Sequence, residues 1–272
     1  MSTINTNVNS LHVQGAMSKN QREMNVTMQR LATGKRINAA SDDAAGLSIS
    51  EGMGAQIKGL GAAARNANDA ISMLQTADGG MASQSDALQR MRELAVLSRT
   101  DTYSTVQKLA LNTEFAALRD QITTVASMTQ WNGASLLDGT TTSYEFQVGA
   151  NAGDTLAISI VSGTLVGYGL TASTAISTAS NASAALVLID TALSALNSSR
   201  STVGSVINRL TYAVDNLNNA IQNQSESRSK IADTDYANAT SELARQQIIQ
   251  QAGTAMLAQA NQMPAMVLAL LK

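Results

Sequence analysis

The sequence predicts a mainly α protein, a long coiled-coil-like helical rod with one β-hairpin, in which the terminal helices form a separate inner coiled-coil domain. Three observations support this fold class. Apolar residues recur at helical spacing at both chain ends and through the interior. One short segment alternates between apolar and polar residues instead. The only proline is Pro264, so long helices can run without a break.

The chain opens with one amphipathic stripe and closes with another. Both keep the three- and four-residue spacing of a helix face, with Asn20 or Gln21 at one position of the first. Exposed contiguous apolar surface marks an interaction site, so we expect the stripes to pair with each other and with further copies. The alternative is that the two ends pack only on each other inside a monomer. The expected polymerisation interface comprises Val13, Met17, Met24, Met28, Leu31, Leu243, Ile249, Met256, Leu257, Met263, Leu268 and Leu271.

The interior contains longer seams with the a/d spacing of a coiled coil. One runs from Ile57 to Leu74, and shorter segments follow around Leu88 and Phe115. The longest runs from Leu186 to Ile221, with Arg200 as its only interruption. A period of 3.5 residues kept this long predicts a left-handed supercoil of neighbouring helices, and therefore a rod.

Between these seams the period changes from helical to alternating. Residues 143–161 alternate on both sides of a turn at 149–154, which predicts a β-hairpin. Residues 162–183 are rich in Ser, Thr, Ala and Gly and are expected to form a variable surface loop. Gly79-Gly80 and Asn132-Gly133 are expected to mark bends between elements, which gives roughly five helices and a hairpin.

The expected domain organisation follows from these patterns. Residues 1–42 form an N-terminal inner helix that pairs with a C-terminal inner helix at 230–272. Residues 43–229 form the rod with its hairpin and loop. Each terminal helix loses conformational entropy on ordering, and its narrow stripe offsets that loss only when neighbours cover it. We therefore expect the two ends to be disordered in the free monomer and to fold on docking.

Composition argues against several classes of function. The net charge of -2 offers no electrostatic basis for binding nucleic acid or an anionic membrane. No run approaches the roughly 18 apolar residues that span a bilayer, so no membrane insertion is expected. The start has no basic and apolar signal segment, which indicates a cytoplasmic protein or one exported by a route that reads no such signal.

The residues needed for catalysis are mostly missing from the sequence. There is no cysteine and one histidine, His12, so the familiar zinc sites and Ser-His or Cys-His pairs lack parts. No phosphate-binding loop of the Gly-x-x-x-x-Gly-Lys type occurs. Asp42-Asp43 and Asp233-x-Asp235 could hold a cation, but serve more naturally at helix N-termini. We expect no enzyme activity, cofactor or metal.

Several segments resemble the bacterial flagellins in the right order along nearly the whole chain. The resemblance is carried by Leu31–Ser50 (LATGKRINAASDDAAGLSIS), Arg65–Ser72 (RNANDAIS), Gln75–Gly79 (QTADG), Phe146–Asn151 (FQVGAN), Ser225–Asp235 (SESRSKIADTD) and Gln251–Gln262 (QAGTAMLAQANQ). Residues 162–183 lie outside it, where larger members insert outer domains. The chain is thus identified as a short member lacking those domains.

This resemblance implies a structural subunit that self-assembles into the helical filament of the bacterial flagellum and serves motility. It also implies a secreted, extracellular protein that uses the flagellar type III export apparatus and an export chaperone, and that meets the filament cap and hook-junction proteins. Two alternatives stay open. One is a hook-filament junction protein, and the other is a surface adhesin or glycan-binding flagellin homologue.

The resemblance also implies a possible contact surface for a host Toll-like receptor. In this family the receptor binds a patch whose residues match Gln89, Arg90, Leu94 and Glu114 in this sequence. A second interpretation needs no receptor. Leu94 falls on a helix seam, and the charged residues then serve contacts between subunits.

Overall fold

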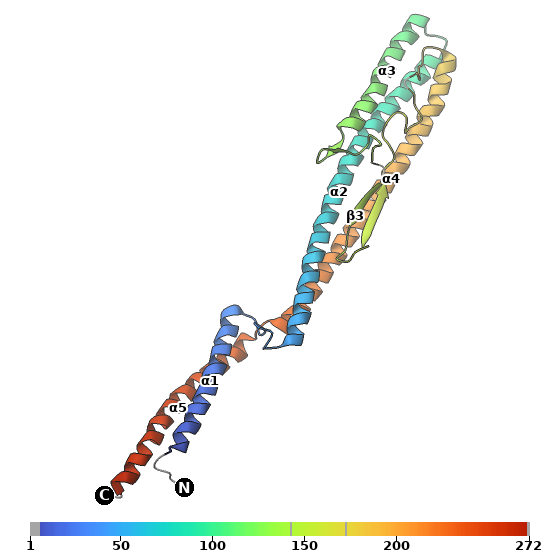
Figure 1. Cartoon of the computed structure of the whole chain (residues 1–272). Helices are drawn as coiled ribbons and strands as arrows, with labels where there is room; N and C mark the ends of the chain where they lie inside the picture. The colour runs from blue at the N-terminus through green and yellow to red at the C-terminus, as the bar shows by residue number, and fades with distance from the viewer. Residues whose placement is uncertain (1–5, 142, 172, 271–272) are drawn as a thin grey trace. The chain divides into compact units, whose positions relative to one another are not determined.

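The computed structural model describes residues 6–141, 143–171 and 173–270, and it divides the chain into two compact units (Figure 1). The terminal unit joins Met1–Ala55 to Asn223–Lys272, and the middle unit is Gln56–Gln222. Each unit thus has its own internal contacts. The predicted mainly α fold class is confirmed.

The described residues form five helices and four strands. The helices are α1 (Val8–Thr33), α2 (Ala44–Arg99), α3 (Thr105–Met128), α4 (Ala179–Ala232) and α5 (Tyr236–Leu270). The strands are β1 (Gln130–Trp131), β2 (Ala134–Ser135), β3 (Ser143–Gln147) and β4 (Thr155–Ser159). Each strand pairs only with its sequence neighbour, β1 with β2 and β3 with β4.

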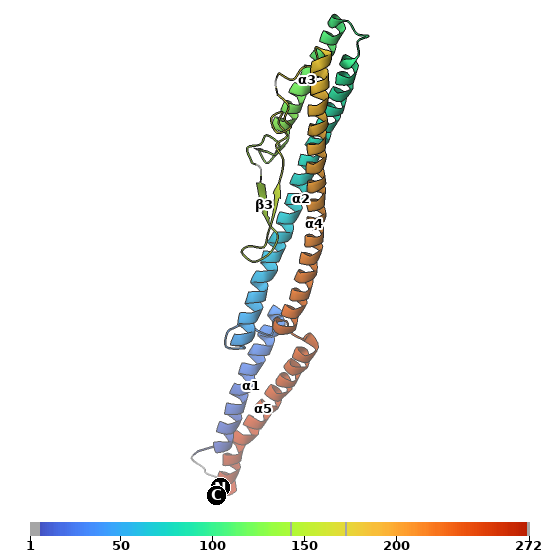
Figure 2. The ribbon, with the colours of Figure 1, turned by 90° about the vertical axis from the view of Figure 1, so that its right-hand side faces the viewer.

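In the middle unit α2, α3 and α4 run side by side (Figures 1 and 2). Both α3 and α4 are antiparallel to α2, because their contacts with it run in opposite sequence directions. For α4, Arg92 bonds Asp190 while the earlier Asp78 bonds the later Arg200. For α3, Arg90 bonds Glu114 while the earlier Gln84 bonds the later Ile122. The predicted seam residues Leu74, Ile189, Leu196 and Leu210 are fully buried between these helices.

The one interruption of the long α4 seam is explained by an ion pair. Arg200 occupies a seam position, and its Nε donates to Oδ1 of Asp78 on α2 at 2.8 Å. Both side chains are about two-thirds buried, at 35% and 39% exposure. The hydrogen bond to Asp78 raises the pKa of Arg200. A polar residue at this position therefore links two helices and does not break the seam.

The bend expected at Gly79-Gly80 is wrong, because α2 continues through both glycines. Position 80 needs a small residue because another segment of the chain packs closely against it. A Cβ added at Gly80 would lie 2.5 Å from Oγ1 of Thr129 and 2.9 Å from Cδ1 of Leu137. Gly80 thus allows the segment after α3 to approach the side of α2 closely.

The predicted hairpin is present as β3 and β4, with Tyr144 opposite Ile158 and Phe146 opposite Leu156. Its apolar side chains pack on the core of the middle unit, and Figure 2 shows it on one side of the helices. A second hairpin, β1–β2, was not expected because its strands are two residues long. The Asn132-Gly133 bend is confirmed as its turn, with φ of 48° and 81° at the two residues, as a type I′ turn requires.

The variable surface loop expected at 162–183 needs two corrections. Helix α4 already begins at Ala179, so the last five residues are helical. The loop is also anchored, since Tyr168, Leu170 and Ile176 are at most 4% exposed within the core of the middle unit. Three apolar residues spaced among many small polar ones are enough to hold the segment against the helices.

A buried glutamine holds this loop to the helices. Gln84 of α2 is fully buried, and its Nε2 donates to the backbone oxygens of Ile122 at 3.1 Å and Gly163 at 2.8 Å. Its Oε1 accepts from the hydroxyl of Tyr168 at 2.7 Å. Burial raises the pKa of Tyr168, which keeps this hydroxyl protonated as a donor. One side chain thus connects α2, α3 and the loop.

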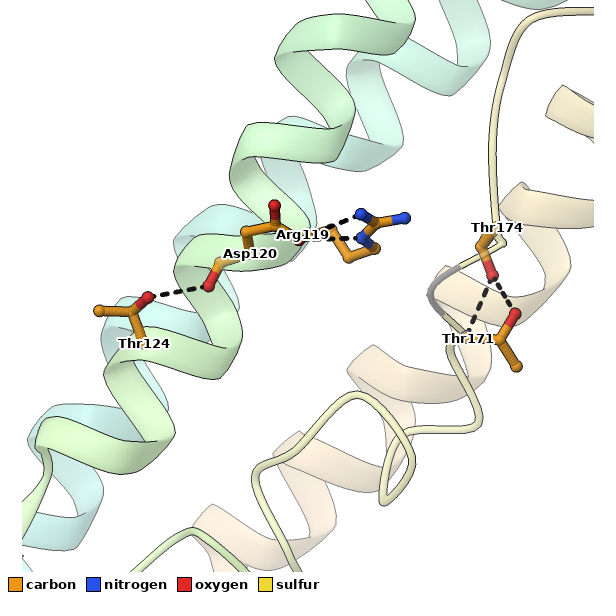
Figure 3. A network of polar contacts seen from close by, with 5 residues as sticks. All are labelled: Arg119, Asp120, Thr124, Thr171 and Thr174. Carbon is orange, nitrogen blue, oxygen red and sulfur yellow. Dashed lines mark hydrogen bonds and ion pairs between the residues drawn. The ribbon is translucent and has the colours of Figure 1, made fainter.

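The outer part of the loop closes on itself. The backbone N–H of Thr171 donates to Oγ1 of Thr174 at 3.1 Å, and that of Thr174 to the Thr171 oxygen at 3.0 Å. Figure 3 shows this turn together with α3, where Arg119 bonds Asp120 and Thr124 donates to the Asp120 carbonyl. The loop surface therefore has local order of its own.

Helix α4 contains a stretch that is long and apolar enough to cross a membrane, with a mean hydropathy of 1.4 over 18 residues. Length and composition are weak indications, because core helices have the same properties. In α4 the residues Ile189, Leu196, Val203 and Leu210 lie in the core of the middle unit. Packing against α2 accounts for their apolar character.

We expect Tyr168→Phe to destabilise the middle unit by about 1–3 kcal/mol, because Oε1 of Gln84 would stay buried without its donor. Urea unfolding can be followed through the single tryptophan, Trp131, which lies in this unit. Tyr212→Phe is the matched control, since Tyr212 is 74% exposed. Equal unfolding midpoints for both variants would contradict the anchoring role of Gln84.

Candidate functional site

The terminal unit consists mainly of α1 and α5, which pair along their length (Figure 1). The pair is antiparallel, because Asn7 before α1 bonds Ala260 late in α5 while Tyr236 at the start of α5 bonds Leu31. We call the facing residues the inner seam. They are Ser10, Val13, Met17, Asn20, Met24, Thr27 and Leu31 of α1, and Ala239, Leu243, Gln246, Gln250, Gly253, Leu257 and Ala260 of α5.

The best-buried positions of the inner seam carry small or polar side chains. Asn20 is 6% exposed, and its Nδ2 donates to the Gln246 carbonyl at 2.9 Å and to Oε1 of Gln250 at 3.3 Å. A Cβ added at Gly253 would lie 2.9 Å from Cγ of Met17, so the helices are close there. The seam therefore fixes the pairing of the helices, while its larger apolar residues are only half-buried.

A second apolar stripe on α5 is about half exposed. It consists of Ile249, Met256 and Met263, spaced seven residues apart, and we call it the outer stripe. Their exposed fractions are 47%, 61% and 49%. At about 100° per residue, this stripe lies roughly 90° around the helix from the inner seam. Gln247 and Thr254 lie on the opposite flank, which is polar.

The residues expected in the polymerisation interface fall into three groups. Val13, Met17, Met24, Leu31, Leu243 and Leu257 are half-buried in the inner seam. Met28, Ile249, Met256 and Met263 are exposed. The side chain of Leu268 and the whole of Leu271 lie outside the described part. In α1 the inner seam contains Thr27, 3% exposed, where the sequence pattern suggested Met28, 52% exposed.

The missed seam residues share one property. Ser10, Thr27, Gln246 and Gly253 complete the three-and-four spacing, but none is an apolar residue with a large side chain. A search for apolar stripes passes over them. The spacing itself was the available signal, since Asn20 had already shown that polar residues occupy this face.

Two linking segments, residues 34–43 between α1 and α2 and residues 233–235 between α4 and α5, are held together by hydrogen bonds, and we call them the connector. The backbone N–H of Arg36 donates to the Ala232 oxygen at 2.7 Å, and that of Thr234 to the Gly34 oxygen at 3.0 Å. The Arg36 guanidinium also donates to the Ile231 oxygen at 2.6 Å. Gly34 ends α1 with φ of 71°, a value that favours glycine. Hydrogen bonds between residues 34–36 and 231–234 therefore fix the position at which the pairing of α1 and α5 begins.

Two of the four aspartates proposed at helix N-termini are confirmed there. Asp43 Oδ1 accepts from the N–H of Gly46 at 2.8 Å, and Asp235 Oδ1 from that of Ala237 at 2.9 Å. Asp42 differs, because its Oδ2 accepts from the N–H groups of Asn38 and Ala39 in the connector, each at 3.0 Å. These bonds, that from Asn38 foremost, lower the pKa of Asp42. Asp233 bridges to Lys35 through its backbone.

The residues of the possible receptor patch lie on α2 and α3. Arg90 donates to Glu93 and to Glu114, each at 2.9 Å, and these bonds raise its pKa. Gln89 is exposed beside them. Leu94, in contrast, is fully buried in the core of the middle unit, as the seam interpretation expected. Val96 and Leu97, 49% and 39% exposed, supply the apolar surface on this side of α2.

The ionisable side chains of the described residues do not gather into a metal site. No three His, Asp or Glu side chains gather there as a metal site would require. His12 is exposed on α1. The ionisable groups with shifted pKa values form ion pairs or turns at the surface, apart from the hydroxyls of Tyr144 and Tyr168 and the partly buried Arg200. The ionisable side chains of the described residues thus mainly form contacts within and between helices and in turns.

Comparison with known proteins gives matches at both ends and over the whole length. Residues 4–142 match the bacterial flagellin N-terminal helical region, and residues 186–271 match the C-terminal helical region. Flagellin of Halalkalibacterium halodurans is 42% identical over 99% of both chains. Flagellin of Bacillus subtilis is 36% identical, also over 99% of both chains.

A solved structure is similar as well. The crystal structure of Bacillus cereus flagellin aligns with a TM-score of 0.50 and 32% identity. The alignment covers 56% of this chain and 88% of the other.

The connector generates a prediction on pH. A lowered pKa means that the charged form of Asp42 stabilises the fold above its usual pKa, and that this contribution is lost as pH falls through the lowered value. We expect the amide shifts of Asn38 and Ala39 to titrate together below about pH 3.8 in an NMR titration. Asp42→Asn should abolish that titration. If these amide shifts changed at or above the ordinary aspartate pKa, the pKa of Asp42 would not be lowered and the prediction would be wrong.

Proposed function

We propose, because this chain belongs to the bacterial flagellin family, that the outer stripe of α5 and the exposed apolar residues of α1 form its assembly surface. The family polymerises into the flagellar filament. The protein is therefore a structural subunit of that filament, serving motility, and is not an enzyme. The proposal concerns which residues make the contacts between copies.

The observation that carries the proposal is the division of apolar surface within the terminal pair. The residues buried between α1 and α5 are small or polar, such as Ser10, Asn20 and Ala260. The six larger apolar residues of the inner seam are only half-buried, and Ile249, Met256 and Met263 lie outside the seam. A monomer that needed only its own two ends would bury the larger residues first. Other copies are the natural cover for this surface.

The energetics point in the same direction. Helices α1 and α5 contain 26 and 35 residues, and ordering each residue costs roughly 1–2 kcal/mol of backbone entropy. The large apolar residues of the inner seam are only half-buried, so their burial offsets only part of that cost. We infer that the folded pair of α1 and α5 is only marginally stable in a free subunit and is stabilised on docking. This agrees with the sequence-based expectation that the two chain ends fold on assembly.

The proposed domain organisation has the inner helices at 1–42 and 230–272 and the rod at 43–229. Contacts between identical copies that repeat without closing generate a helical filament. Heterologous contacts require two different surfaces on each subunit. The outer stripe of α5 and the exposed Val8, Leu11 and Val26 of α1 offer such a pair.

The filament lies outside the cell, so export precedes assembly. We propose that the chain leaves by the flagellar export apparatus with the help of an export chaperone, and that it meets the cap and hook-junction proteins at the filament ends. Marginal terminal helices suit passage through a narrow channel, because they unfold at low cost. Neither alternative function, junction protein or adhesin, gains support from the family matches at both ends.

Recognition by a host Toll-like receptor also stays a proposal. Gln89, Arg90 and Glu114 are surface groups that a receptor could contact, whereas Leu94 is buried. Exposed Val96 and Leu97 are the apolar neighbours on which such a contact would rely.

We expect Ile249→Asp or Met256→Asp to slow the elongation of seeded filaments by about a hundredfold, because docking would bury an unpaired carboxylate. Electron microscopy and light scattering measure the growth. Thr254→Asp places the same charge on the polar flank of α5 and is the matched control. Growth of the Ile249 and Met256 variants at the control rate would refute the assignment of the outer stripe.

Hydrogen exchange tests the proposed coupling between docking and folding. The amides of α1 and α5 should exchange much faster than those of α2 and α4 in the free subunit, and should become protected in the filament. Uniform protection along the free chain would show that the ends are stable alone.

A further inference from the structure

Methionine is the only source of sulfur in this chain. The sequence contains 12 methionines and no cysteine, so no thiol competes for an oxidant. Two-electron oxidants convert the thioether to a sulfoxide, which is polar and strongly accepts hydrogen bonds. The question is therefore which thioethers a dissolved oxidant can reach.

The methionines differ sharply in exposure. Met73, Met81 and Met91 are 6%, 0% and 0% exposed in the core of the middle unit. On the terminal helices, Met28, Met256 and Met263 are 52%, 61% and 49% exposed. Met128 at the end of α3 is also open, at 75%, but lies in the middle unit. Oxidant can thus reach the outer stripe while the core thioethers are covered.

Two of the three outer-stripe residues are methionines. Met256 and Met263 follow Ile249 at intervals of seven residues on one side of α5. Methionine suits a contact surface because it is apolar and flexible. A sulfoxide at the same position keeps the length of the side chain but adds an oxygen that loses its water when a second copy covers it. The residue that favours docking becomes one that opposes it.

We propose that Met28, Met256 and Met263, the assembly methionines, form an oxidation-sensitive site that controls whether a subunit can join another copy of this chain. The oxidant is a peroxide. Each thioether takes one oxygen atom from hydrogen peroxide, sulfur loses two electrons, and the peroxide is reduced to water. In an assembled filament the neighbouring copies cover these residues and protect them. This inference rests on the proposed assembly surface.

The first test compares free and assembled protein. Full-length subunits are treated with hydrogen peroxide, freed of it, and added to untreated seeds. We expect elongation to fall about tenfold or more, with sulfoxide at Met256 and Met263 in peptide mass spectra. Filaments treated in the same way should show little oxidation at these positions. Unchanged growth despite sulfoxide at both residues would overturn the proposal.

Substitution identifies the responsible residues. The variant Met28→Leu/Met256→Leu/Met263→Leu keeps apolar groups of similar volume and should grow at the same rate before and after peroxide. Met128→Leu is the matched control and should be as sensitive as the natural chain. If the triple variant lost growth as the natural chain does, the site would lie elsewhere.

Repair provides a test that needs no variant. Methionine sulfoxide reductases of both stereospecificities should restore the growth of oxidised subunits. Failure of repair, with the sulfoxides removed, would also overturn the proposal. Untreated subunits that do not elongate seeds at all would instead contradict the proposed assembly surface, so the two failures are distinguishable.

Discussion

The behaviour of the terminal unit depends on the small and polar side chains that are buried between α1 and α5. Asn20, Thr27, Gln246 and Gly253 bring the two helices close, and hydrogen bonds such as that from Asn20 to the Gln246 carbonyl set their register. Because the buried side chains are small or polar, the seam specifies a partner without removing much apolar surface from water. The terminal pair is therefore well defined but only partly satisfied within one chain.

The middle unit has the opposite character. Its core is continuous from α2 through α3 and α4, and Phe115, Leu74 and Met81 are among its fully buried residues. Gln84 inside it is paired with Tyr168 and two backbone oxygens, so its burial leaves neither polar atom unsatisfied. The chain thus combines a unit with a continuous buried core and a terminal pair that, in the proposed assembly, other copies complete.

This division explains why a structural protein without a catalytic site still has a functional surface. In the proposed assembly, function resides in apolar groups that the fold leaves exposed, above all the outer stripe of α5. The same exposure that permits docking leaves the sulfur atoms of Met256 and Met263 open to solvent before assembly. In this proposal, sensitivity to oxidation and the capacity to polymerise have one physical origin, the exposure of these side chains.

The sequence by itself determined the helical class, the long seams, the β3–β4 hairpin and the family, because these depend on periodicity and on motifs carried by neighbouring residues. Only the tertiary structure decided that α2 runs through Gly79-Gly80, that Tyr168 anchors the loop, and that Thr27 and not Met28 faces α5. In each case the deciding partner, Thr129, Gln84 or the facing helix, lies far away in the sequence. Local patterns show which residues can be buried, and packing selects which of them are.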